Sequence, residues 1–277
     1  AAAPYILAKL KLKKLILDYD DFDFDRSPMF KISAINKLIF GSNDIWKITE
    51  NIAKISKACI ISSNYLVNIF KKFNDKTFYI PTGVDTDKFY INQPRNLPTD
   101  KIIFLWNGMV WGEIMYNNVL FLIECFAEVY KQLKQQNSSI KLEFNIAGDG
   151  GYMPKLMALK DSKFKDLPIN FKGFISPNQM PQLLNNATIG LLPLIPDAQN
   201  KEWLESKSPT KLFEYLAMAL PTVAHNFGEC KYILKNGYNG LLADDKENFI
   251  KQMLNLIQNK ELYQRISENA LKTAQNE

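Results

Sequence analysis

Short apolar runs alternate along this chain with longer stretches in which apolar residues recur every three or four positions. The runs predict strands at residues 14–18, 58–62, 77–80, 101–106, 142–147, 169–172, 188–193, 222–225 and 240–243. The periodic stretches predict helices at 30–40, 44–56, 64–73, 118–135, 176–186, 209–220, 245–258 and 261–275. Strands that alternate with helices predict an α/β fold with parallel sheets, which bind ligands at the carboxyl ends of their strands.

The stretch at residues 85–98 interrupts this alternation. It is rich in Asp, Asn and Pro and carries neither apolar pattern, so we interpret it as a linker between two domains. We place the domains at residues 1–90 and 91–277.

Composition narrows the class of protein only moderately. With 277 residues, 47% hydrophobic and 23% charged, the chain is typical of a globular protein of one large or two modest domains. The net charge of +5 fits an anionic ligand or a membrane surface without deciding between them. No apolar run reaches the length of a membrane span.

Cysteine and histidine usage excludes several kinds of chemistry. The three cysteines are far apart and lack metal-ligand spacing, which favours a reducing compartment. His225 is the only histidine, so a mechanism that needs two histidines is excluded, and we interpret His225 as structural. Because the chain starts at Ala1 without a convincing signal peptide, we expect it to begin inside a larger protein.

The segment at residues 208–224 carries the most chemical information. Ser208 is a suitable N-cap and Pro209 a suitable first helical residue, while Pro221 ends the helix and a strand follows. The N–H groups and dipole of such a helix start form an anion site. Glu214 lies about one turn further, where its carboxylate can accept hydrogen bonds from sugar hydroxyls. Together these features suit a nucleotide-sugar.

The same segment resembles the donor-binding core of bacterial retaining glycosyltransferases of the GT-B fold, the glycogen-synthase-like superfamily (family 4-type, group 1). Further segments that resemble this family follow in its order, at residues 79–85, 104–108, 146–150, 171–174 and 236–242. The resemblance covers roughly residue 76 to the C-terminus. It implies two Rossmann-like domains, an incomplete acceptor-side domain at 1–90 and a donor domain at 91–277.

The resemblance also implies an activity and a set of site residues. The chain is expected to move a sugar from a nucleoside diphosphate to an acceptor hydroxyl with retention, in polysaccharide or glycolipid synthesis, without metal or other cofactor. Glu205 and Glu214 are the expected catalytic residues, Glu214 also holding the ribose. The residues that match donor-binding positions are Gly108, Gly148, Phe174, Ser208, Thr210, Lys211, Leu212 and Glu214. The expected partners are a nucleotide-sugar donor and a glycan or glycolipid acceptor, not nucleic acid, at a cytoplasmic location.

Two departures from the family pattern concern the catalytic machinery. Ser206 stands where many members have a Glu eight residues before Glu214, and Glu205 is one position off. Members often carry an Arg and a Lys shortly after the glycine that matches Gly108, to neutralise the diphosphate leaving group. Here no Arg or Lys follows Gly108 before Lys131, and Trp111 resembles a subfamily with Trp-Asn-Gly-Gly-x-Trp in this loop.

These departures leave two rival functions open. The first is a nucleotide-sugar-binding protein with weak or no catalysis. The second is a metal-dependent phosphatase built on Asp18 and Asp20, although Phe22 stands where that pattern wants Thr or Val. A peripheral membrane contact through the lysines at positions 9, 11, 13 and 14 is also left open, against a simple solvated basic face.

Overall fold

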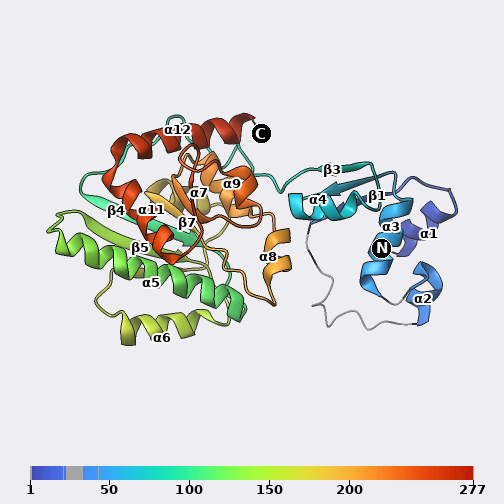
Figure 1. Ribbon diagram of the computed structural model, residues 1–277, viewed down its shortest axis with the longest axis horizontal. Coiled ribbons are helices and arrows are strands. Elements are labelled where there is room, and N and C mark those ends of the chain that lie inside the picture. Colours follow the sequence, from blue (N-terminus) through green and yellow to red (C-terminus); the bar gives the residue numbers. More distant parts are fainter. Residues whose placement is uncertain (1, 21, 23–33, 43, 277) are drawn as a thin grey trace. The chain divides into compact units, whose positions relative to one another are not determined.

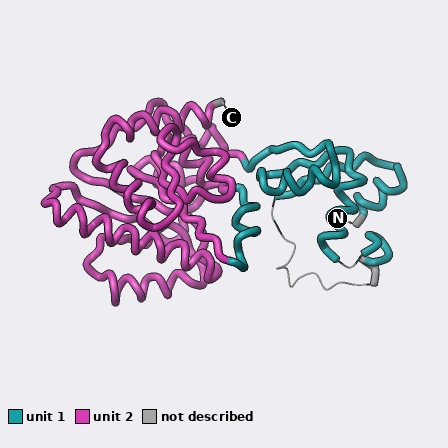
Figure 2. The backbone as a smooth tube through the Cα atoms, in the orientation of Figure 1, with its two compact units in different colours: residues 1–82, 198–208 teal, residues 83–197, 209–277 magenta. Residues whose placement is uncertain are grey.

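The structure is a computed structural model that describes residues 2–20, 22, 34–42 and 44–276. The described residues form two compact units (Figure 2). Unit 1 contains residues 1–82 and 198–208, and unit 2 contains residues 83–197 and 209–277. Residues 21 and 23–25, close to Asp18 and Asp20, and residues 30–33 of the predicted helix at 30–40 lie outside the described residues. The domain limits at residues 90 and 91 stay a prediction.

Unit 1 is built on a parallel sheet of three strands in the order β1-β2-β3 (Figure 1). Its strands are β1 (Ile16–Tyr19), β2 (Ala58–Ile61) and β3 (Thr77–Tyr79). Its helices are α1 (Ala2–Lys9), α2 (Ala34–Phe40), α3 (Ile45–Ile55), α4 (Asn64–Phe70) and, from much later in the sequence, α8 (Lys201–Ser206). α8 packs against α4.

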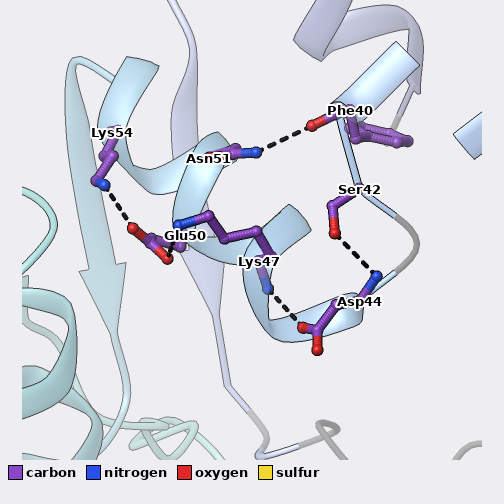
Figure 3. Close-up of polar contacts among 7 residues, drawn as sticks. All are labelled: Phe40, Ser42, Asp44, Lys47, Glu50, Asn51 and Lys54. Atoms are coloured by element: carbon purple, nitrogen blue, oxygen red, sulfur yellow. Dashed lines mark hydrogen bonds and ion pairs between the residues drawn. The ribbon is translucent and has the colours of Figure 1, made fainter. Parts of the chain in front are cut away.

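Local side chains fix where the helices of unit 1 begin. The Asp44 carboxylate accepts a hydrogen bond from the backbone N–H of Lys47 at 2.8 Å, so it caps the start of α3 (Figure 3). Within α3, Glu50 pairs with Lys47 and Lys54. Ser63 caps α4 by accepting from Leu66 N–H. The apolar side of these helices packs on the sheet and forms the core of unit 1. Its fully buried residues include Cys59 and Ile61 of β2 and Leu66 and Phe70 of α4.

Unit 2 contains a six-stranded parallel sheet in the order β6-β5-β4-β7-β8-β9. Its strands are β4 (Lys101–Asn107), β5 (Lys141–Ala147), β6 (Ile169–Gly173), β7 (Ile189–Leu192), β8 (Thr222–His225) and β9 (Leu241–Ala243). Its helices are α5 (Glu113–Gln135), α6 (Met153–Lys163), α7 (Met180–Asn186), α9 (Thr210–Ala217), α10 (Cys230–Ile233), α11 (Lys246–Gln258) and α12 (Lys260–Asn276).

The side chains of β4 show how helices cover both faces of this sheet. Phe104 and Trp106 join a core with residues of α5 and α11, whereas Leu105 points to the other face and packs with residues of α7 and α9. Figure 1 shows α5 and α9 on opposite sides of the strands. Because β4 pairs with β5 on one side and with β7 on the other, strand order reverses beside β4. Ligands of such sheets bind at this reversal.

The predicted linker contains no helix or strand, and in unit 2 it is held by Arg95. The half-buried Arg95 side chain donates hydrogen bonds to the carbonyls of Leu184, Asn185 and Ala187, at the end of α7, and of Met218, at the end of α9. Burial lowers the pKa of Arg95. The guanidinium satisfies carbonyls that helix ends leave without partners.

The predicted strands are confirmed to within about two residues at each end, the usual uncertainty of element ends. The prediction was less good for helices. α5 begins at Glu113 rather than residue 118 and α7 at Met180 rather than 176, while α1, α6, α8 and α10 were not predicted. The predicted fold class, α/β with parallel sheets in two Rossmann-like domains, is confirmed. No helix in the described ranges is long and apolar enough to cross a bilayer.

Candidate functional site

Three loops meet at the carboxyl edge of the large sheet, following β4, β5 and β6. Backbone hydrogen bonds join them: Gly108 N–H donates to the Ala147 carbonyl at 2.9 Å, and Gly148 N–H donates to the Gly173 carbonyl at 2.8 Å. Val110 N–H donates to the Asp149 carbonyl at 2.8 Å. These bonds extend the strand ladder past the sheet edge and fix the loops beside the strand reversal.

Glycine is required for this close approach of two backbones. Gly148 has φ of +132°, and a Cβ at that position would lie 1.8 Å from the Gly108 carbonyl oxygen. Gly150 has φ of +135°, and its Cβ would lie 2.6 Å from the Val110 backbone. The Gly-Asp-Gly turn is therefore part of the construction of the loop that follows β4.

Lys211, in the first turn of α9, directs its ammonium group into the loop that follows β4. Its Nζ lies 5.0 Å from the centre of the Trp106 ring and 3.0 Å from the place a Cβ would take on Gly108. Burial lowers the pKa of Lys211 to about 8, opposed by the negative charge of Glu214. No carboxylate of the described residues lies within 4.0 Å of this ammonium group. A partly desolvated cation without an anionic partner therefore stands at the sheet edge.

Glu214 lies one turn after Lys211 and is oriented by Asn107 at the end of β4. The Asn107 Nδ2 donates to Glu214 Oε2 at 3.4 Å, and Asn107 Oδ1 accepts from the Tyr215 hydroxyl at 2.6 Å. Burial raises the pKa of Glu214, opposed by the hydrogen bond from Asn107 and by the charge of Lys211. Gly190 leaves room for the fully buried Tyr215 ring, because a Cβ there would lie 2.7 Å from the ring.

The start of α9 differs from the prediction. The N-cap is Pro209 rather than Ser208, and the helix begins at Thr210, because ψ of 88° at Pro209 is not helical. The Ser208 hydroxyl instead accepts a hydrogen bond from Thr82 N–H at 3.2 Å, within unit 1. Leu212 is buried and its N–H donates to the Pro209 carbonyl at 2.8 Å. The expected role of Leu212 in donor binding stays a prediction.

The remaining predicted residues fall in different places. Thr210 is exposed at the first helical position, and its N–H and that of Lys211 have no acceptor among the described residues. Phe174 is 67% exposed just after β6. Glu205 belongs to α8 in unit 1, where its charge helps to raise the pKa of Tyr65. The expected contact of Glu205 with the donor sugar stays a prediction.

Two buried polar side chains hold the loop that follows β7. His225 Nδ1 accepts from Leu194 N–H at 3.0 Å, and Asn118 Oδ1 accepts from Ile195 N–H at 3.1 Å. Burial lowers the pKa of His225 to about 4, so the ring is neutral at pH 7. These contacts support the structural interpretation of His225.

Asp18 and Asp20 are exposed at the end of β1, and no three His, Cys, Asp or Glu of the described residues gather as metal ligands.

The residues at the sheet edge that sequence reasoning missed are Asn107 and Tyr215. Asn107 belongs to the motif at residues 104–108, of which the sequence analysis assigned only Gly108 to the site. Tyr215 has the sequence pattern of an aromatic core residue. An Asn as the last residue of a buried strand is the signal that was available.

Two Rossmann-like units with a glycine-lined site at the edge of a parallel sheet define a protein of the GT-B fold class. The sequence profile of the family described as "Glycosyl transferases group 1" matches residues 102–259, more than half of the chain. The chain therefore belongs to the group 1 glycosyltransferase family.

Individual relatives agree with this assignment. The alpha-monoglucosyldiacylglycerol synthase of Acholeplasma laidlawii is 31% identical over 203 residues, which cover 69% of this chain and 46% of the relative. The chain thus spans less than half of that relative's length. The structure of HepE of Anabaena in complex with UDP matches with a TM-score of 0.69 and 14% sequence identity. The match covers 99% of this chain and 70% of the HepE chain. Sucrose-phosphate synthase of Thermosynechococcus elongatus matches with a TM-score of 0.67 and 13% sequence identity. That match covers 99% of this chain and 66% of the synthase chain.

Proposed function

We propose that this protein transfers a sugar from a nucleoside diphosphate, with UDP as the first candidate, to an acceptor hydroxyl with retention of configuration. The observation that carries the proposal is the placement of Lys211 and Glu214 at the edge where the glycine loops meet. The membership of the group 1 family and the UDP bound by the Anabaena protein of similar fold support the choice of donor.

Lys211 is the residue that we assign to the diphosphate. The loop that follows Gly108 lacks the Arg and Lys of many relatives, and the Lys211 ammonium group enters this loop from α9. When the bond from the anomeric carbon to the diphosphate breaks, negative charge grows on the leaving oxygen. The acceptor oxygen bonds to that carbon, and its proton passes to the departing diphosphate. A cation already in place stabilises that charge without reorganisation. The N–H groups of Thr210 and Lys211 add two further donors.

Glu214 is assigned to the ribose hydroxyls. Asn107 holds one carboxylate oxygen, which leaves the other to accept from a ligand. Lys211 lies one turn away and favours the charged form of Glu214, and ionised acceptors make stronger hydrogen bonds. The glycines at 108 and 148 leave the backbone accessible for close approach of the nucleotide.

A glycolipid is the acceptor that the comparisons favour, because the curated relative is named for glucosyldiacylglycerol synthesis. A polysaccharide acceptor is the second candidate. We place the reaction at the cytoplasmic face of a membrane, with the basic residues 9–14 as the contact to anionic lipid.

Binding of nucleotide-sugar without transfer is the rival function, and a specific observation favours it. Ser206, where relatives have a Glu, is fully buried, and its hydroxyl donates to the Trp203 carbonyl rather than facing a ligand. Transfer and binding must therefore be measured separately.

The test uses UDP-glucose with a diacylglycerol or glycan acceptor and compares wild type with Lys211→Met and the exposed-surface control Lys134→Met. We expect Lys211→Met to lose transfer, measured as UDP released per acceptor glycosylated, and Lys134→Met to retain it. Binding of UDP-glucose without transfer by wild type, across a panel of acceptors, would establish the rival. Full transfer by Lys211→Met would remove Lys211 from the catalytic role.

A second variant addresses the ribose contact. Glu214→Gln keeps the shape of the side chain but removes its charge, which costs about 1.5–3 kcal/mol for a charge-assisted bond, or roughly tenfold or more in UDP affinity. Glu202→Gln, on α8 in unit 1, removes a charge elsewhere and is expected to leave UDP affinity unchanged. Calorimetry on both variants tests the assignment, and equal affinities for wild type and Glu214→Gln would refute it.

A further inference from the structure

A chain of hydrogen bonds reaches Glu214 from the interior of unit 2. The Tyr215 hydroxyl donates to Asn107 Oδ1 at 2.6 Å, and Asn107 Nδ2 donates to Glu214 Oε2 at 3.4 Å. Tyr215 is fully buried and Asn107 is 7% exposed, whereas Glu214 is half-buried. The carboxylate is therefore the end of this chain that a ligand can reach, and the tyrosine is the end that the core holds.

The hydroxyl of Tyr215 determines which atom of the Asn107 amide faces Glu214. Within the described ranges, Asn107 is the one acceptor of this hydroxyl. Burial raises the pKa of Tyr215, so the hydroxyl keeps its proton and remains a donor. An amide side chain has one atom that accepts hydrogen bonds and one that donates them. Because the oxygen of Asn107 accepts from Tyr215, its nitrogen is turned toward Glu214.

This orientation of the amide suits an ionised Glu214, which can only accept hydrogen bonds. The bond from Asn107 opposes the effect of burial, which raises the pKa of Glu214, and the charge of Lys211 acts in the same sense as the bond. With the amide turned the other way, Asn107 Oδ1 would face a carboxylate oxygen, and two acceptors would repel each other. Tyr215 thus acts on Glu214 through Asn107.

The packing around Tyr215 leaves its ring little freedom. Gly190 in β7 makes room for the ring, since a Cβ there would lie 2.7 Å from it. The ring belongs to an apolar cluster with Leu105 of β4 and Leu220, which follows α9. A hydroxyl buried among such residues is destabilising unless it has a hydrogen-bond partner. The ring is therefore fixed by packing, and its hydroxyl is fixed by Asn107.

We propose that Tyr215 is a positioning residue for the nucleotide: its hydroxyl fixes the Asn107 amide so that Nδ2 holds one oxygen of Glu214 and leaves the other to the ribose. The inference rests on the proposed function, because it concerns the same ribose contact. A phenylalanine at position 215 would fill the same space and leave the amide of Asn107 without the contact that orients it.

The experiment measures the affinity of the full chain for UDP and for inorganic pyrophosphate, which lacks a ribose, by calorimetry. The variants are Tyr215→Phe, Glu214→Gln and the two combined. The matched control is Tyr263→Phe, which removes another buried tyrosine hydroxyl of unit 2, one that donates to the Thr188 carbonyl at 2.9 Å, just before β7. This carbonyl is at the amino edge of the sheet, whereas Asn107 is at the carboxyl edge.

We expect Tyr215→Phe to weaken UDP about fivefold and to leave pyrophosphate unchanged, because the diphosphate is assigned to Lys211. Tyr263→Phe should change neither affinity. In the Glu214→Gln background, Tyr215→Phe should weaken UDP less than about twofold, since the charge on which it acts is gone. Both single Tyr→Phe variants remove one buried hydrogen bond, so each should lower the melting temperature by about 2–4 °C.

A variant that removes both partners guards against loss of folding. Asn107→Leu/Tyr215→Phe replaces the buried hydrogen bond by apolar groups of similar shape, which is close to neutral for stability. It should fold and bind UDP at least about fivefold more weakly than wild type. UDP affinity equal to that of wild type in this variant would overturn the inference even where Tyr215→Phe does not fold.

Three other results would overturn the inference while the proposed function stands, provided that Glu214→Gln weakens UDP. They are an unchanged UDP affinity in Tyr215→Phe, equal losses for UDP and pyrophosphate, and the same loss in the Glu214→Gln background as in wild type. The second and third would show that Tyr215 supports the fold only. Equal UDP affinities of wild type and Glu214→Gln would instead refute the ribose assignment in the proposed function, and the inference with it.

Discussion

Lys211 allows the proposed donor site to be tested through the protons it exchanges when a nucleotide binds. In the free protein burial lowers its pKa to about 8, because the ammonium group is partly desolvated and has no carboxylate beside it. A bound diphosphate supplies the missing anion and raises the pKa of Lys211 toward its ordinary value of about 10.4. Binding of UDP near pH 8 should therefore take up protons from the solvent.

The size of this uptake follows from the two pKa values. At pH 8 Lys211 is about half protonated when free and almost fully protonated when bound, so about 0.5 proton is taken up per UDP. At pH 9 the uptake rises to about 0.9, and at pH 6.5 it falls below about 0.05. Because the bound state prefers the charged form, affinity is complete below the free pKa and is lost as pH rises. It should fall about fivefold between pH 8 and pH 9.

Isothermal titration calorimetry measures the uptake as the dependence of the binding enthalpy on the ionisation enthalpy of the buffer. At and above pH 8 the phosphates of UDP are already ionised and contribute little. Lys211→Met should abolish the uptake and weaken binding by about tenfold or more, whereas Lys134→Met should retain both. An enthalpy independent of buffer between pH 8 and pH 9, or the same uptake in Lys211→Met, would refute the assignment of Lys211 to the diphosphate.

Two further predictions concern how the site is built. Gly148→Ala should lower the free energy of unfolding by about 1–3 kcal/mol and weaken UDP binding, because its Cβ would clash with the Gly108 carbonyl. The control is Gly151→Ala, whose Cβ would meet nothing within 4 Å and which should change neither quantity. Urea unfolding checks the stability, and equal midpoints for the two alanine variants would contradict the clash. Arg95→Gln removes a half-buried guanidinium that holds the ends of α7 and α9. It should destabilise unit 2 by about 2–4 kcal/mol, compared with about 0.5 kcal/mol or less for the exposed Arg265→Gln. Similar melting temperatures for these two variants would show that the Arg95 contacts contribute little.

The sheet of unit 2 was predictable because β4 and β7 are continuous apolar runs, whereas β5 and β6 alternate apolar with polar residues, and both patterns indicate strands. α6 was missed for the converse reason: only Met153 and Leu156 of this helix are buried, so its sequence shows little of the apolar periodicity that marks a helix. The boundary at the start of α9 was wrong because Ser-Pro fits a helix start in general, whereas here Ser208 bonds to Thr82.

The candidate site was predictable only in part, because its geometry depends on contacts between distant residues. Glu214 and the glycine loops follow from local patterns and the family resemblance. The contact of Asn107 with Glu214 joins residues 107 positions apart, and nothing in the sequence near either residue indicates it. Lys211 alone resembles any solvated lysine of a helix start. Its entry into the loop that follows β4 is visible only once β4 and α9 are placed side by side.

The late position of α8 in the sequence has a consequence for how the protein is made. A ribosome delivers residues 1–82 before residues 198–208, and the earlier stretch supplies α4 but not the helix that packs against it. Unit 1 is completed only when residues 198–208 emerge, after β4, β5, β6 and β7 have been synthesised. Until then the nascent chain exposes the side of α4 that α8 will cover, and exposed apolar surface of this kind recruits chaperones or aggregates. Unit 1 is thus completed only after residues 83–197 of unit 2 have been translated.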